Sequence, residues 1–145
     1  MNFSDFITHH GKRINKDHYI HLIQVSKIDR VIDPTELEML HKKGRKFGLT
    51  DPEIDKLINT EIHNHYQPPY SLHEKFEHLY NVAEMILADD VITESEKRMI
   101  KKFAIETGFD DKAIDKLIEL LLEGIKNNES EEALLDKFKK HLFKD

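Results

Sequence analysis

Hydrophobic residues recur every three or four positions through most of this chain. The clearest series includes Ile114, Leu117 and Leu121, whose spacing places the side chains on one face of a helix. Shorter amphipathic segments lie at Phe3–His10 and Ser130–Phe143. Together these patterns predict an all-α fold, a single-domain helical bundle of about seven to eight helices. The six central helices are expected over residues 15–28, 34–47, 51–63, 71–88, 94–107 and 110–126.

Glycine and proline residues mark the ends of these helices. Gly48 and Gly108 each follow a periodic segment and precede acidic residues, which is typical of a helix end, a short turn and a new helix. Pro68 and Pro69 cannot continue a helix, so they are expected to lie in a linker. The chain then divides into a first unit at 15–63, a linker at 64–70, a second unit at 71–126 and a C-terminal helix at 130–143.

The two units repeat one another in sequence. When the sequence is shifted by 60 residues, the segment 29–58 aligns without a gap to 89–118, and 13 of 30 positions are identical. Average composition would give about two identities. Two units are too few for an open solenoid. We therefore expect two pseudo-symmetric three-helix repeats that pack together as one domain over residues 1–145.

Two turns at equivalent positions in the repeat share a motif. They span Ile28–Glu36 and Ala88–Glu96. In these turns, and in the surrounding repeat over residues 15–125, the chain resembles the TerB-like family of tellurite-resistance proteins. The family motif is Ala-Asp-Gly, an aliphatic residue two positions on, and a glutamate four positions later. The matching residues are Ala88, Asp89, Ile92 and Glu96 in the second turn and Asp29, Ile32 and Glu36 in the first, whereas Arg30 and Asp90 occupy the glycine position.

The resemblance implies an acidic, all-helical module of a family without an established catalytic activity. TerB-like domains are linked to tellurite resistance and stress responses, and a similar domain forms the amino-terminal region of a membrane-linked DnaJ-type co-chaperone. A metal-related or scaffolding role, with protein partners, is what the resemblance leads us to expect.

Structural roles alone could explain the acidic residues of the two turns. Asp33 and Thr93 each precede a glutamate by three positions, at Glu36 and Glu96, which is the capping-box spacing that satisfies free helix amides. The aspartate Asp29, like its equivalent in the second turn, falls near the carboxyl end of a predicted helix, where a negative side chain costs roughly 0.3–1 kcal/mol. A hydrogen bond from the turn backbone would offset that cost.

A metal site is the alternative interpretation. Asp29, Asp89 and Asp90, together with Glu36 and Glu96, would supply hard oxygen ligands for a divalent ion such as Ca, Mg, Mn or Zn if the two turns meet. An EF-hand is not expected, because apolar or basic side chains stand where its first two ligands belong.

Composition limits the remaining functions. With 22 Lys+Arg and 28 Asp+Glu the formal charge is −6, which opposes binding to nucleic acid. The chain has no cysteine, so thiol chemistry is excluded. It shows no signal peptide and no apolar stretch long enough to span a bilayer, so we expect a cytoplasmic protein without membrane insertion. No phosphate-binding loop or nucleophile elbow appears, and no enzyme is predicted.

Other features concern surfaces. The basic stretches at 42–46 and 97–102 follow acidic first turns, which suits the helix dipole and a solvated face. Among 10 histidines, His18 and His78 are equivalent in the repeat, and His18 and His21 share a helix face, yet scattered surface positions are the simpler interpretation. Leu120 widens the apolar surface of its helix and is a candidate partner contact. Two functions stay open, an acidic metal-associated module and a metal-free interaction or co-chaperone-associated scaffold module.

Overall fold

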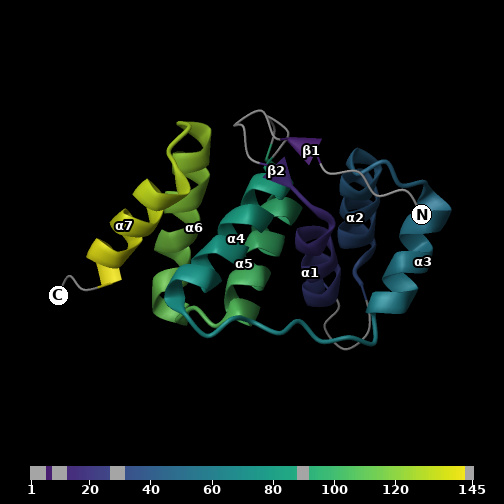
Figure 1. The fold of residues 1–145 in the computed structure, drawn as a ribbon, viewed down its shortest axis with the longest axis horizontal. Helices are drawn as coiled ribbons and strands as arrows, with labels where there is room; N and C mark the ends of the chain where they lie inside the picture. The colour runs from purple at the N-terminus through teal and green to yellow at the C-terminus, as the bar shows by residue number, and fades with distance from the viewer. Residues whose placement is uncertain (1–5, 8–12, 27–31, 88–91, 143–145) are drawn as a thin grey trace.

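Seven helices and one pair of short strands make up the part of the chain that the structure describes. The computed structural model describes residues 6–7, 13–26, 32–87 and 92–142. The second and third helices lie at one end of the molecule and the last two helices at the other, and the remaining three lie between them (Figure 1). The helices are α1 (Lys16–Ser26), α2 (Pro34–Lys46), α3 (Asp51–Glu61), α4 (Leu72–Ile86), α5 (Glu94–Thr107), α6 (Asp111–Lys126) and α7 (Glu131–Leu142).

The predicted all-α class is confirmed, and the helix boundaries agree closely with the hydrophobic pattern. Gly108 ends α5 with a φ of 102°, and Gly48 follows α2 with a φ of 85°. Both values lie in the left-handed region that glycine adopts at low cost. At the start of α5, Thr93 and Glu96 form the expected capping box. Local sequence signals therefore position the helix ends.

Phe6 and Ile7 are the described residues of the amphipathic segment Phe3–His10, and they are not helical. Within it, Phe6–Ile7 is β1, which pairs antiparallel with β2 at Arg13–Ile14. A helix of that length is marginal without tertiary support, whereas the strand pairing satisfies backbone groups and Ile14 is fully buried. The helical expectation was wrong for Phe6–Ile7, because strand pairing depends on a contact between two segments and helical periodicity within one segment cannot reveal it.

Buried apolar residues form one cluster that extends from Ile14 to Phe138. α1, from the first unit, packs against both α4 and α5 of the second, and α2 also packs against α5. The two units therefore share their core. The linker crosses between them along one end of the helices (Figure 1).

Aromatic side chains pack α7 against this core. The ring centroid of Phe138 is 6.0 Å from that of Phe76 in α4. It is 5.6 Å from the ring centroid of Phe109, which precedes α6. Leu134 and Leu135 are also buried. This contact positions α7 alongside α6 and so creates the groove described below.

Candidate functional site

The structure describes two of the five predicted metal ligands. Glu36 lies in the first turn of α2 and Glu96 in the first turn of α5. The three aspartates, Asp29, Asp89 and Asp90, lie outside the described residues. The predicted metal site therefore stays a prediction, and only the contacts of the two glutamates can be described.

Glu96 is buried and bound from two sides. Its Oε1 accepts a hydrogen bond from the backbone N–H of Thr93 at 3.0 Å, and its own N–H donates to the Thr93 hydroxyl at 3.1 Å. Its Oε2 is 3.0 Å from Nζ of Lys43, an ion pair with side chains 0% and 5% exposed. Lys43 also donates a 2.8 Å hydrogen bond to the carbonyl oxygen of Ile86. A lysine of α2 thus joins the end of α4 to the start of α5.

Glu36 has a similar neighbour from the second unit. Nζ of Lys102, in α5, is 3.2 Å from Oε2 of Glu36 and donates a 2.8 Å hydrogen bond to the carbonyl oxygen of Ser26. The side chains of this pair are 18% and 19% exposed, so water screens it more than the Lys43–Glu96 pair. A lysine of α5 thus joins the end of α1 to the start of α2.

The two lysine contacts follow the same pattern. Ser26 and Ile86 are 60 positions apart in the sequence, as are Glu36 and Glu96. In each case one ammonium group binds the last carbonyl of one helix and the first-turn carboxylate of the next, and the lysine belongs to the other unit. The carboxyl end of a helix carries partial negative charge. The ammonium group therefore neutralises a carboxylate and a helix end at once.

The position of Lys43 corrects the expectation of a solvated basic face. Its side chain is fully buried, and Lys102 is mostly buried. The residue equivalent to Lys43 in the second unit is Phe103, which is also fully buried. The repeat alignment therefore indicated that Lys43 occupies a core position, because its equivalent is a phenylalanine. The run of basic residues around Lys43 suggested a solvated face instead.

The start of α2 also differs from the predicted capping box. The Asp33 carboxylate accepts a 2.7 Å hydrogen bond from the backbone N–H of Thr35, so Asp33 is an N-cap residue as expected. This hydrogen bond holds the pKa of Asp33 below its ordinary value. The partner glutamate, Glu36, binds Lys102 instead of completing the box. Residues of both helix starts line a hollow of 230 Å³, formed by Thr35, Glu38, Met39, Lys42, Thr93, Ser95 and Glu96.

The two described glutamates are each paired with a lysine. Each already has an ammonium group within 3.0–3.2 Å of a carboxylate oxygen, and a divalent ion at the same oxygens would face a positive charge at short range. In the described parts of the chain, no three His, Asp or Glu side chains are grouped so that they could hold a metal.

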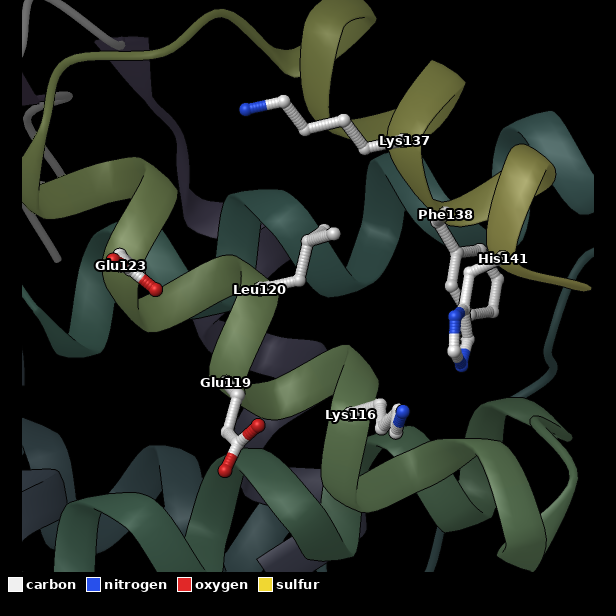
Figure 2. Close-up of a pocket in the computed structure, with 7 residues that line it drawn as sticks. All are labelled: Lys116, Glu119, Leu120, Glu123, Lys137, Phe138 and His141. Carbon is white, nitrogen blue, oxygen red and sulfur yellow. The ribbon is translucent and has the colours of Figure 1, made fainter.

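A groove between α6 and α7 is the second candidate site. Leu120 is half-buried and projects from α6 toward α7, where Phe138 lies (Figure 2). Charged side chains surround this apolar centre, and a second hollow of 390 Å³ adjoins it along α6. The groove has a volume of 320 Å³ and is lined by Lys116, Glu119, Leu120, Glu123, Lys137, Phe138 and His141.

Comparison of this chain with protein-family models, with curated proteins and with solved structures found no match. The TerB-like resemblance therefore stays a prediction based on the two turns and the repeat. None of the described helices combines the length and apolar character needed to cross a bilayer.

Proposed function

We propose that this chain is a non-enzymatic, TerB-like module that binds other proteins in a cytoplasmic stress-response context such as tellurite resistance. We also propose that its two units are related by approximate two-fold symmetry. The observation that carries the proposal is the pair of lysine contacts, in which each unit supplies an ammonium group to the other unit's helix junction. The internal cations give the junctions a structural role without a metal ion.

Charge balance favours this function over a metal-associated one. A buried carboxylate needs a partner charge, and Lys43 provides it for Glu96 at 3.0 Å. A metal ion bound to this oxygen would displace Lys43. The ammonium group would then be buried without the Glu96 carboxylate, and the Ile86 carbonyl would be buried without its hydrogen-bond donor. The junctions are thus better suited to hold helices together than to release and bind an ion.

Metal titration tests this assignment. We expect that chelator-treated protein will show no saturable heat of binding with Ca, Mg, Mn or Zn in calorimetry, because lysines neutralise the junction carboxylates. Saturable binding that is lost in the Asp29→Asn/Asp89→Asn variant would instead establish the metal-associated function. The matched control is Asp115→Asn/Asp136→Asn, which removes the same charge from exposed positions of α6 and α7.

The groove between α6 and α7 supports the protein-binding part of the proposal. Protein interfaces combine an apolar centre with a polar rim. Leu120 is surrounded in this way by Lys116, Glu123 and Lys137, and the buried Phe138 forms the wall beneath it. A groove between two helices suits an amphipathic partner helix that inserts one apolar side chain. Leu120 is the residue on which such contact would centre.

Site-specific cross-linking tests the groove. A photoreactive phenylalanine analogue at Leu120 is expected to give discrete adducts with other proteins in cells of the source organism. The control position is Ile105 in α5, which is 46% exposed and does not line the groove. Equal labelling at both positions, or none at Leu120, would contradict a role for the groove.

A further inference from the structure

Two histidines from different units stack on one another where α1 packs against α4. His21 lies in α1 and His78 in α4, and their ring centroids are 5.0 Å apart with an interplanar angle of 17°. Tyr66 of the linker lies against both, with its ring centroid 5.1 Å from that of His21. Its hydroxyl is 2.8 Å from Nδ1 of His78. The three side chains join the two units and the linker.

The surroundings of the pair favour neutral imidazole rings. Nδ1 of His21 is buried and has no hydrogen-bond partner, so its protonation would bury an unpaired N–H donor and a charge. In the tautomer of neutral His78 that carries its proton on Nε2, Nδ1 accepts a hydrogen bond from the Tyr66 hydroxyl. Burial raises the pKa of Tyr66 to about 12, so this hydroxyl keeps its proton across the range in which histidine titrates.

Nearby charges act in both directions on the pair. On α1, Asp17 raises the pKa of His21, but burial and the charge of His78 lower it by more. On α4, Glu77 and Glu74 raise the pKa of His78, and burial again outweighs them. From α5, the uncharged Phe103 ring packs on Tyr66 at 5.0 Å, and the nearby Thr107 is fully buried and also uncharged.

We propose that His21, His78 and Tyr66 form a pH-sensitive switch that holds α1 and the linker against α4 at neutral pH and weakens this contact on acidification. Stacked rings at 5.0 Å would become two like charges in a partly buried site. The two rings would titrate as a coupled pair. The switch acts within the fold and does not depend on the proposed protein-binding function.

The direction of the pH effect follows from the protonation states. A lowered pKa in the folded protein means that the unfolded chain binds more protons than the folded one below the ordinary histidine value of about 6.5. The stabilisation is therefore complete above about pH 6.5 and decreases as the pH falls through the lowered pKa values. Most carboxylates stay ionised down to about pH 5.5, so this window isolates histidine.

The test is urea unfolding and amide hydrogen exchange at about pH 7.5 and about pH 5.5, combined with NMR titration of the histidine rings. In the unmodified protein we expect a lower unfolding midpoint at the acidic pH and pKa values of His21 and His78 below the ordinary one. We also expect weaker protection across 16–26 at the acidic pH, where protection is the exchange rate relative to that of an unstructured amide at the same pH. His78→Gln keeps an acceptor for Tyr66 but removes the charge, so its midpoint should drop clearly less. His73→Gln, an exposed position on α4, should show the full drop.

Two results would overturn the proposal. One is that the unfolding midpoint drops on acidification by as much in His78→Gln and in His21→Phe/His78→Gln as it does in the unmodified protein. The other is ordinary titration of both rings in the unmodified protein, which remains decisive even if the variants fail to fold. Metal binding in calorimetry would sink the proposed function but leave this titration unaffected, so the two failures are distinguishable.

Discussion

Replacing Lys43 by alanine is expected to lower the free energy of unfolding by about 3–5 kcal/mol, because it leaves a buried carboxylate without its counter-charge. Glu96 is buried, and Lys43 Nζ is 3.0 Å from its Oε2. The substitution also removes the donor to the carbonyl oxygen of Ile86. Urea unfolding followed by circular dichroism measures the effect. Since the pair joins α2 to α4 and α5, the loss should affect the whole fold.

Two further variants show whether the buried charge is the cause. Lys43→Met/Glu96→Gln removes both charges and keeps a capping side chain for the Thr93 N–H, so it should recover much of the lost stability. Lys102→Ala breaks the more exposed pair with Glu36 and should cost only about 1 kcal/mol. If Lys43→Ala were no more destabilising than Lys102→Ala, the central role of the buried pair would be refuted.

Replacing Phe138 by alanine is expected to cost about 3–5 kcal/mol and to release α7 from the rest of the molecule. The side chain is 2% exposed and packs on Phe76 and Phe109, so its removal leaves a cavity between three elements. Because α7 lies at one end of the molecule (Figure 1), much of this loss should appear as local unfolding. Amide hydrogen exchange should become fast across α7 while the central helices keep their protection.

The matched control for this variant is Asp136→Ala, an exposed position on the same helix, which should leave exchange in α7 unchanged. If the groove between α6 and α7 is the binding surface, Phe138→Ala should also abolish the cross-links from position 120. Full protection of α7 in Phe138→Ala would show that other contacts hold the helix.

The aspartates on which the metal hypothesis rests show how far sequence reasoning reached. The pattern of Asp29, Asp89 and Asp90 could be recognised from the repeat, but the three residues lie outside the described parts of the chain, so their role stays a prediction. Glu36 and Glu96 could also be recognised as candidate ligands from the repeat, and the structure then showed which residues they contact. Glu36 and Glu96 each bind a lysine of the other unit.

The sequence by itself determined the helices, because their signals are local. Apolar spacing defines a helix face within a few turns, and Gly108 with Thr93 marks two helix ends through backbone conformation and short-range hydrogen bonds. The same local periodicity failed at Phe6–Ile7, where strand pairing decides the structure.

Only the tertiary structure decided which polar groups meet. Lys43 and the Ile86 carbonyl are 43 positions apart, and His21 meets His78 across the boundary between units. Helical periodicity specifies which face is buried, but not which helix covers it. Burial then gives these groups their properties, because a lysine or histidine removed from water depends on the few atoms that surround it. Those atoms come from distant parts of the chain.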